Sequence, residues 1–419
     1  MTQLPKLFRV RQRFAAPIVA DIPAAVAAEM GRLRGALRPG ASVAVGVGSR
    51  GISNLAVIVR EVCRALSGQG AAPFIVPAMG SHGGGTAAGQ REILAGYGVT
   101  EEAVGAPVRA SMEVVELGRT PSDVRVFLDR EAAGADFILP VNRVKPHTDF
   151  KGENESGLVK MTAIGLGKLV GAGEYHRAAF NLGHARVFRE VTQAVLATGR
   201  MLGGVAILEN ARHETARIAA VPAAGLIEED HELLEEARRM MPRLPCEEID
   251  LLVIDEMGKD VSGAGMDTNI IGRAPQGYLA GVPAFAGAPR IMRILVRDLT
   301  PASHGNAVGI GLADFTTARL MAKLNPEVMI LNSLTALAPM CAKLPVSFAR
   351  DREAIEAGLR TAGLEDLSSG RLVRIKNTLA LEELEMSEAY LGEVRGRDDL
   401  AVVGEPREIE FNADGNLDE

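Results

Sequence analysis

The chain has 419 residues, of which 47% are hydrophobic and 24% charged. It is too long for one core, so the sequence indicates a globular protein of two domains. A net charge of −7 argues against nucleic acid as the main partner, because binding phosphates needs a basic surface. Three widely spaced cysteines argue against a disulfide framework and a zinc spacing, and favour buried thiols in a cytoplasmic protein.

The N-terminal segment predicts neither export nor membrane insertion. "MTQLPKLFRVRQRF" is basic, but no long apolar run follows it, so we expect no signal peptide. No uncharged apolar stretch of about 18 residues occurs anywhere in the chain, so we expect no transmembrane helix.

The first half of the chain alternates apolar runs of strand length with helical patterns. Residues 42–47 and 72–79 predict buried strands, and residues 55–66 between them predict a helix with an apolar stripe. This βαβ unit indicates a parallel sheet. Further strands are expected at 135–142 and 204–210, and helices at 86–98, 184–199 and 228–241.

A second α/β domain is expected after the proline-rich stretch around Cys246. Residues 249–257, 293–299 and 327–334 predict strands there, and residues 313–324 a helix. We therefore expect two α/β domains with mostly parallel sheets and an active-site cleft between them. The expected boundaries are 1–245 and 246–400, followed by a polar tail, 401–419, for which the sequence leaves two options: a frayed end, or packing back on the first domain.

The stretch "GVGSRG", with Gly46, Gly48 and Gly51, follows a predicted strand and precedes a predicted helix. Its spacing matches a dinucleotide-binding turn, in which glycine lets the backbone approach a phosphate at a helix N-terminus. The next strand has no acidic residue at its end to bind a ribose, which argues against NAD. Ser49 and Arg50 can bind a phosphate or carboxylate there, and a glycine-rich turn with a solvated arginine is the equal alternative.

Two histidines follow predicted strands. His82 lies in the turn "GSHGGG", and His147 in "KPHTDFKGE", where Asp149, Lys151 and Glu153 surround it. Ligands of parallel α/β sheets bind at the carboxyl ends of strands, and histidine transfers protons near neutral pH. Both are therefore candidate acid/base residues, although a loop histidine is often only a solvated surface group.

Lys160 lies among apolar residues, and His176 follows it sixteen positions later. A lysine in an apolar setting can act as a nucleophile or an attachment point. A single histidine binds a metal only where a cofactor supplies other donors. On spacing alone, a lysine reaching solvent and a histidine at the core edge are the better explanation of the pair. His184, His213 and His231 carry no recognisable context, and His304 follows a strand of the second half.

Together these residues resemble the nickel-pincer lactate racemase family. The resemblance rests on "GSH" with His82, on His147 ahead of "SGLVK" with Lys160, on the interval from Lys160 to His176, and on Arg50 after a strand. It covers most of the first domain. The interval from His147 to Lys160 is longer than in the family, and no Tyr-Gln-x-x-Lys run occurs in the second domain. The chain therefore resembles a divergent branch rather than a lactate racemase proper.

The resemblance implies an isomerase, a racemase or epimerase of a small 2-hydroxy acid. The implied cofactor is the nickel-pincer nucleotide, pyridinium-3,5-bisthiocarboxylic acid mononucleotide nickel, which takes a hydride from the substrate. The implied roles are acid/base catalysis for His82 and His147, a thioamide tether for Lys160, nickel binding for His176, and binding of the nucleotide phosphate for Gly48, Ser49, Arg50 and Asn54. Lys259, Asn269 and Arg273 are expected to reach the substrate.

Two other functions compete with this interpretation. One is an NAD(P)-dependent oxidoreductase that uses the "GVGSRG" turn, and the other is a non-enzymatic protein that closes on a small anion. Binding of NADH would favour the first alternative. The second leaves His82 and His147 without a proton to transfer. The sequence does not reveal the oligomeric state.

Overall fold

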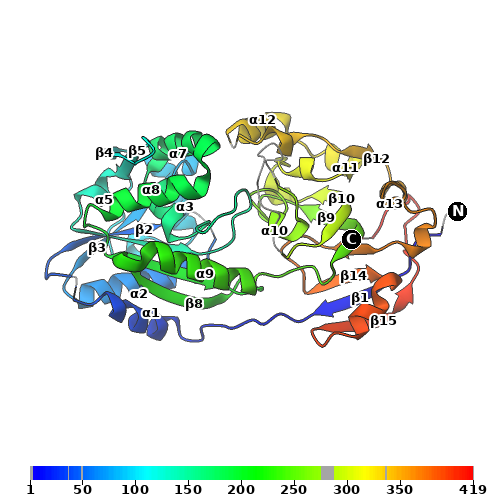
Figure 1. Ribbon diagram of the computed structural model, residues 1–419, viewed down its shortest axis with the longest axis horizontal. Coiled ribbons are helices and arrows are strands. Elements are labelled where there is room, and N and C mark those ends of the chain that lie inside the picture. The colour runs from blue at the N-terminus through cyan, green and yellow to red at the C-terminus, as the bar shows by residue number, and fades with distance from the viewer. Residues whose placement is uncertain (1–2, 36, 49–50, 275–286, 336, 419) are drawn as a thin grey trace. The chain divides into compact units, whose positions relative to one another are not determined.

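The computed structural model describes residues 3–35, 37–48, 51–274, 287–335 and 337–418 (Figure 1). It is a mixed α/β protein with mostly parallel sheets, as the sequence predicts. Contacts divide it into an N-terminal unit, Ala15–Met241, and a C-terminal unit, Met1–Phe14 with Pro242–Glu419. No helix among the described residues is long and apolar enough to cross a membrane.

The N-terminal unit is built on a five-stranded sheet in the order β3-β2-β6-β7-β8. The bounds are β2 Ser42–Val47, β3 Ala72–Pro77, β6 Phe137–Arg143, β7 Gly203–Glu209 and β8 Thr215–Pro222. β3, β2, β6 and β7 are parallel, and β8 is antiparallel to β7. The four strands expected in this half of the chain are confirmed.

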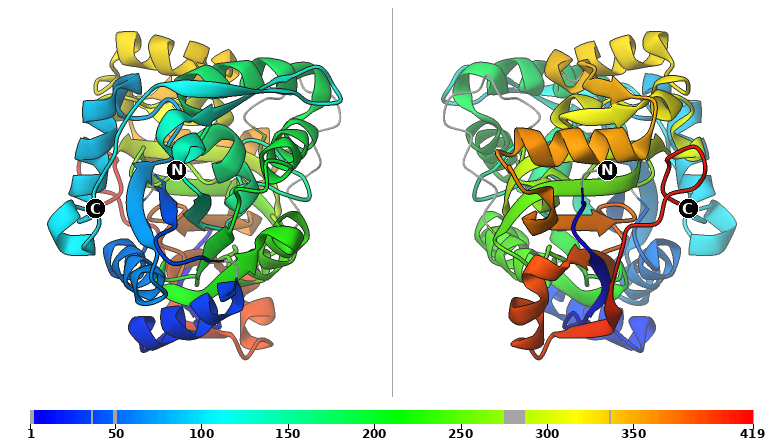
Figure 2. Two further views of the ribbon diagram at one scale, coloured as in Figure 1. Left: turned by 90° about the vertical axis from the view of Figure 1, so that its left-hand side faces the viewer. Right: turned by 90° about the vertical axis from the view of Figure 1, so that its right-hand side faces the viewer.

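Helices cover both faces of this sheet (Figure 2, left). On β2, Val43, Val45 and Val47 pack in a core with residues of α1 and α2, while Ala44 packs in the opposite core with residues of α8 and α9. This alternation explains why the strands are apolar throughout: both faces are buried. The helices are α1 Ile22–Met30, α2 Leu55–Gly68, α3 Ala87–Gly96, α4 Glu101–Val104, α5 Arg130–Gly134, α6 Leu158–Lys160, α7 Lys168–Leu182, α8 His184–Leu196 and α9 Leu226–Met240. β4 Val114–Arg119 and β5 Arg125–Asp129 form a separate hairpin.

The C-terminal unit is built on an eight-stranded sheet in the order β12-β11-β10-β9-β13-β14-β1-β15. The first five strands are parallel and the last three are antiparallel to their neighbours. The strands are β1 Leu7–Gln12, β9 Glu248–Met257, β10 Arg290–Leu299, β11 Phe315–Thr317, β12 Val346–Phe348, β13 Leu372–Ile375, β14 Glu383–Ser387 and β15 Leu400–Arg407. The helices are α10 Thr268–Ile271, α11 Ala318–Met321, α12 Pro326–Thr335, α13 Asp351–Thr361 and α14 Leu391–Arg395.

Both ends of the chain belong to the C-terminal unit, which differs from the expected boundaries. β1 pairs with β14 on one side and β15 on the other (Figure 2, right), so residues 1–14 are not part of the N-terminal unit. Residues 401–419, expected as a frayed end or as a tail on the first domain, instead begin inside β15. Farther along, the backbone of Leu417 contacts the buried ion pair Arg297–Asp351. Its carbonyl accepts a hydrogen bond from the guanidinium of Arg297 at 2.8 Å, and its N–H donates one to the carboxylate of Asp351 at 3.0 Å.

The strand expected at 327–334 was wrong, because this segment is helix α12. Pro326 opens the helix, where its missing N–H costs nothing, and the side chain of Asn325 accepts the N–H of Val328 at 3.3 Å. The helix expected at 313–324 is only partly confirmed, because Phe315–Thr317 form strand β11 and Ala318–Met321 form α11.

Candidate functional site

The candidate residues of the N-terminal unit follow the carboxyl ends of its parallel strands. In this sheet β3 lies on one side of β2 and β6 on the other, so the direction of strand order changes between β2 and β6. Ligands of open α/β sheets bind outside the strand ends at such a switch point. The loops after β2 and β6, which carry Gly48 and His147, flank this position.

The loop after β2 lies against the element that carries Lys160. A Cβ on Gly48 would lie 2.8 Å from Cε of Met161 and 3.1 Å from Oδ1 of Asn142, so only glycine fits without displacing a neighbour. Asn54 has a left-handed backbone (φ 59°), and its side-chain amide donates to Oγ1 of Thr215 at 3.0 Å. Ser49 and Arg50 lie outside the described residues, and a phosphate-binding role for this loop stays a prediction.

The loop after β6 is held by a buried carboxylate. The N–H of His147 donates to Oε2 of Glu155 at 2.6 Å, and Arg238 pairs with Oε1 of Glu155 at 2.5 Å. Lys151 donates to the carbonyl of His147 at 2.7 Å. Glu155 is buried and also pairs with Lys151 and Arg238. It therefore holds the backbone of His147 in place, and the surrounding loop orients the ring.

Lys160 lies at the end of α6, directly before a π-helical turn, Met161–Gly165. The buried carboxylate of Asp230 on α9 anchors this segment, since it accepts the N–H of Leu158 at 2.7 Å and the side-chain amide of Asn154 at 3.1 Å. Burial raises the pKa of Asp230 to about 6. Nζ of Lys160 then lies 2.6 Å from Nε2 of His147, so the structure brings these two predicted residues together.

Aromatic contacts join His147 to two further histidines. Phe150 stacks on His147 with ring centroids 4.2 Å apart and on His184 with centroids 4.5 Å apart. His184 in turn meets His176 edge to face at 5.8 Å. Nζ of Lys160 lies 5.7 Å from the centroid of Phe150. His147, Lys160, His176 and His184 therefore form one cluster. No sequence pattern pointed to His184.

The environment of the cluster keeps two of its imidazoles neutral. Burial, and after it the charges that His176 and Lys160 carry when protonated, lower the pKa of His184 to about 4. The pKa of His176 is lowered by the groups packed around it and by a protonated Lys160, although part of its side chain still reaches solvent. A neutral imidazole has a free nitrogen lone pair, which is the form that binds metals.

His82 lies in an exposed loop after β3. Gln90 holds the loop in place: its side-chain amide donates hydrogen bonds to the carbonyls of Gly80 at 2.9 Å and His82 at 3.2 Å. Gln90 in turn accepts from Lys168 at 3.1 Å, and Lys168 pairs with Asp129 at 3.1 Å. All three side chains are buried, so a fully buried polar network connects the His82 loop to the start of α7.

Lys168 is unusual in two ways. Its backbone is left-handed (φ 56°), which non-glycine residues rarely adopt, and its ammonium group is completely buried. Burial lowers the pKa of Lys168 and raises that of Asp129. The sequence pattern did not single out Lys168, because a lysine after glycine ordinarily reads as a surface residue.

The residues expected to reach the substrate lie in the C-terminal unit and are already engaged. Lys259, after β9, donates to the carbonyls of Gly263 at 2.9 Å and Val308 at 3.0 Å. Asn269 donates to Asp267 at 2.8 Å. Arg273 pairs with Asp314 at 2.7 Å, next to the beginning of β11. Lys259 and Arg273 thus lie near opposite ends of the parallel strands, and the structure does not bring them together.

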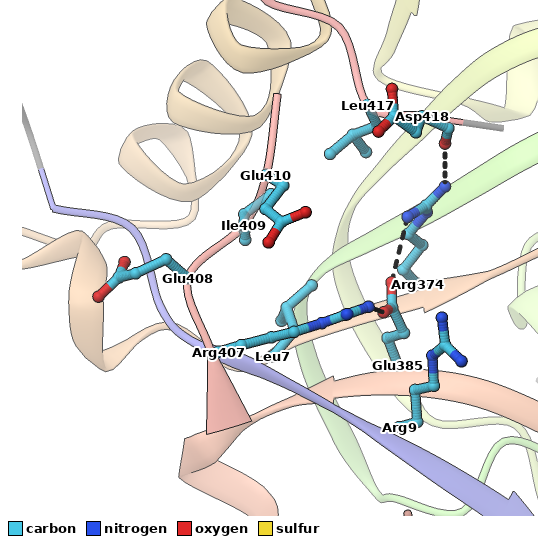
Figure 3. A pocket seen from close by; sticks show the side chains of 10 residues that line it. All are labelled: Leu7, Arg9, Arg374, Glu385, Arg407, Glu408, Ile409, Glu410, Leu417 and Asp418. Atoms are coloured by element: carbon cyan, nitrogen blue, oxygen red, sulfur yellow. Dashed lines mark hydrogen bonds and ion pairs between the residues drawn. The ribbon is translucent and has the colours of Figure 1, made fainter. Parts of the chain in front are cut away.

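A cavity of about 340 Å³ lies elsewhere in the C-terminal unit, beside β1 and β14 (Figure 3). Arg374 bridges Glu385 at 3.1 Å and the carbonyl of Asp418 at 2.9 Å, and Arg407 pairs with Glu385 at 3.3 Å. Glu408 and Glu410 also line it. Carboxylates therefore balance its arginines, and it lacks the positive charge of an anion site.

Two solved structures resemble this fold. The lactate racemase apoprotein from Thermoanaerobacterium thermosaccharolyticum matches over 88% of this chain and 94% of its own, with a TM-score of 0.52 and 12% identity. A Thermotoga maritima protein matches over 68% of this chain and 71% of its own, with a TM-score of 0.46 and 12% identity. No protein-family model matches the sequence, and no curated protein matches it significantly. The chain thus has a racemase-like fold, and its function has to be argued from the site.

Proposed function

We propose that this chain is an isomerase that racemises or epimerises a small 2-hydroxy acid with a lysine-tethered nickel-pincer nucleotide. The observation that carries the proposal is the contact of Lys160 with His147, 2.6 Å between Nζ and Nε2, in a cluster that also holds His176. The racemase-like fold supports the same reaction class.

The protein side chains at this site can supply only part of the ligand set that a bound nickel ion needs. Among the described residues, no three His, Cys, Asp or Glu side chains are arranged to hold a metal ion by themselves. A nickel ion there would need donors from outside the protein, and the sulfur arms of the nucleotide are suitable ones. His176 would bind the metal, Lys160 the nucleotide, and the Gly48–Asn54 loop its phosphate. When bound, the group would supply a hydride acceptor.

The protein's own task would be proton transfer and orientation. His147 would exchange a proton with the substrate's hydroxyl oxygen through Nε2, with its backbone fixed by Glu155 and Lys151. Acylation of Lys160 would remove its basic amine, and so release Nε2 of His147 for the substrate. His82 would serve the opposite face, because an exchange of stereochemistry needs an acid/base group on each side. Phe150 would keep water away from the ring of His147.

The test is the intact mass and nickel content of protein produced together with cofactor-synthesis enzymes. We expect a nucleotide-sized adduct with one nickel per chain in the wild type, lost in Lys160→Ala and also in Lys160→Arg. Arginine keeps a cation beside His147 but cannot form the tether, so it separates attachment from charge. His176→Ala should keep the adduct and lose nickel. A wild-type protein with neither adduct nor nickel would contradict the proposal.

A second experiment separates an isomerase from a binding protein. With loaded enzyme and a panel of chiral 2-hydroxy acids, His147→Asn and His82→Asn should abolish isomerisation and leave the adduct mass unchanged. Substrate deuterated at C2 should keep its label in water, because the hydrogen travels as a hydride and not through solvent. Exchange of that deuterium with water would rule out the hydride mechanism.

A further inference from the structure

The helical segment that carries Lys160 begins without a capping side chain of its own. It starts at Leu158, and Gly157 before it has no side chain that could accept the first N–H groups. These N–H groups have no partner within a helix, and leaving them buried and unsatisfied is costly. Leu158 and Val159 are both buried, so another element has to provide the acceptor.

Asp230 of α9 provides this acceptor. Its Oδ1 accepts the N–H of Leu158 at 2.7 Å, and its Oδ2 accepts the side-chain amide of Asn154 at 3.1 Å. Burial raises the pKa of Asp230 to about 6, against the opposing effect of the N–H groups of Leu158 and Val159, so the carboxylate is ionised at neutral pH. A hydrogen bond to an ionised acceptor is stronger than a bond between neutral groups.

Gly157 allows the carboxylate of Asp230 to come this close. A Cβ on Gly157 would overlap Oδ1 of Asp230 and lie 2.9 Å from its Oδ2. The backbone of Gly157 is extended, with φ of −175°, a conformation that any residue adopts. Glycine is therefore required here for space alone, and a larger residue would push the carboxylate away from the start of the helix.

Two other side chains hold this segment, and they do so by its carbonyl groups. The amide of Asn142 on β6 donates to the carbonyl of Gly157 at 3.1 Å, and the hydroxyl of Thr192 on α8 donates to the carbonyl of Val159 at 3.1 Å. Neutral bonds of this kind are about half as strong as a bond to an ionised group. The segment thus depends most on the contact that Asp230 makes.

We propose that Asp230 is a positioning residue for Lys160: its carboxylate fixes the start of the helix and so sets Nζ of Lys160 against Nε2 of His147, 2.6 Å away. Lys160 lies two residues after Leu158, in the first turn of the segment, so a shift of the helix start moves it directly. The inference rests on the proposed function, in which Lys160 is the attachment point. It adds a residue of α9 that acts through Lys160.

A general loss of stability is the competing explanation for any effect at a buried carboxylate, and four variants separate the two. Asp230→Leu removes the acceptor and fills its space, whereas Asp230→Asn keeps an oxygen for the N–H of Leu158. Gly157→Ala displaces the carboxylate and leaves the sequence of α9 unchanged. Leu233→Ala is the matched control, because it removes a buried side chain of the same helix and leaves Asp230 in place.

The experiment is the ¹⁵N NMR spectrum of the His147 ring at pH 7, in full-length protein that is free of cofactor and labelled at histidine. His147→Asn assigns the resonance, Lys160→Met defines the Nε2 shift without the contact, and circular dichroism verifies that each variant is folded. We expect Asp230→Leu and Gly157→Ala to move the Nε2 resonance to the position that it has in Lys160→Met. Asp230→Asn and Leu233→Ala should keep it at the wild-type position.

A wild-type resonance in Asp230→Leu would overturn the inference, as would an equally large shift in Leu233→Ala. A Lys160→Met spectrum identical to that of the wild type would also overturn it, because there would be no contact to hold. Where Asp230→Leu does not fold, Gly157→Ala decides in the same way.

The proposed function is judged separately, by the adduct on Lys160. The share of chains that carry the adduct should fall at least about fivefold in Asp230→Leu, the low end of the cost of an unsatisfied buried N–H, and Asp230→Asn should restore it. A wild type without any adduct would refute the proposed function, while the spectrum of His147 would still decide the role of Asp230.

Discussion

Nζ of Lys160 lies 2.6 Å from Nε2 of His147, while Nδ1 of the same ring accepts the N–H of Asp149 at 3.0 Å. A neutral imidazole has one N–H and one lone pair. In the tautomer whose Nδ1 accepts from Asp149, the hydrogen is on Nε2, and the contact with Lys160 is a hydrogen bond only while Lys160 is an uncharged amine. This is the form of lysine that attacks a carbonyl carbon.

Lys160 should therefore acylate faster than other lysines at pH 7. An ordinary lysine is uncharged only on the order of once in a thousand molecules at that pH, so we expect at least about tenfold faster labelling of Lys160 than of the exposed Lys343. The measurement is peptide mass spectrometry after brief exposure to acetic anhydride. His147→Ala should abolish the difference. Equal labelling of both lysines in the wild type would contradict the assigned tautomer.

Lys168→Met should destabilise the N-terminal unit by about 3–5 kcal/mol, because it leaves the carboxylate of Asp129 buried and without its cation. The double variant Lys168→Met/Asp129→Leu should recover most of that loss. Urea unfolding provides the free energies. A single variant as stable as the wild type would mean that Asp129 is neutral without its partner.

The same network should hold the His82 loop in place. Gln90→Leu removes two hydrogen bonds to the carbonyls of Gly80 and His82, so amide hydrogen exchange should accelerate across residues 80–86 while α9 is unaffected. In loaded enzyme, kcat should fall more than KM rises. Unchanged exchange in this loop would show that other contacts position His82.

Asp230 should make stability fall as pH rises from about 4 to about 6. Its folded pKa is about 6 against an ordinary 3.8, so between these values the folded state keeps a proton that the unfolded state has lost, and stability decreases with pH. The difference of about two pKa units corresponds to roughly 3 kcal/mol.

Asp230→Asn should flatten this slope, and the exposed Asp414→Asn should not. The measurement is the free energy of unfolding at pH 4 and pH 6.5. Asparagine still accepts the N–H of Leu158, so the variant should fold, with some overall loss of stability from the Asn154 contact. A slope that survives in Asp230→Asn would assign the pH dependence to another group.

A fragment of residues 15–241 should fold alone, and a fragment of residues 242–419 should not. The first contains a complete sheet with both faces covered. The second lacks β1, which lies between β14 and β15, so two strands of its sheet lose a neighbour. Circular dichroism and thermal melting compare the fragments. Addition of a peptide of residues 1–14 should restore cooperative melting of the second.

The sequence predicted the elements whose signals are local. The strands of the N-terminal sheet are continuous apolar runs, because helices bury both faces, and this pattern needs no knowledge of distant residues. The segment 327–334 was predicted wrongly because a short apolar run is compatible with either a strand or a helix. Pro326 and Asn325, at its start, favour the helix.

What the sequence missed depends on contacts between distant residues. Nothing near residues 7–12 reveals that they pair with residues 383–387. His184 gained its context only through its ring contacts with Phe150 and His176. Asp230 lies in the predicted helix at 228–241, where nothing local indicates that its carboxylate holds the segment of Lys160. Of the predicted site, the structure joins Lys160, His147 and His176, and within the C-terminal unit it holds Lys259 and Arg273 near opposite ends of the parallel strands.

The position of β1 has a consequence for how this protein is made. The ribosome synthesises β1 first and its neighbours β14 and β15 last, so at about 5–20 residues per second the first strand waits on the order of a minute for its partners. During that time the N-terminal unit can already fold, while β1 presents two bare edges. An exposed strand edge can pair with other chains. The alternating Arg9 and Arg11 place positive charge on this strand, which opposes such pairing until β14 and β15 have been synthesised.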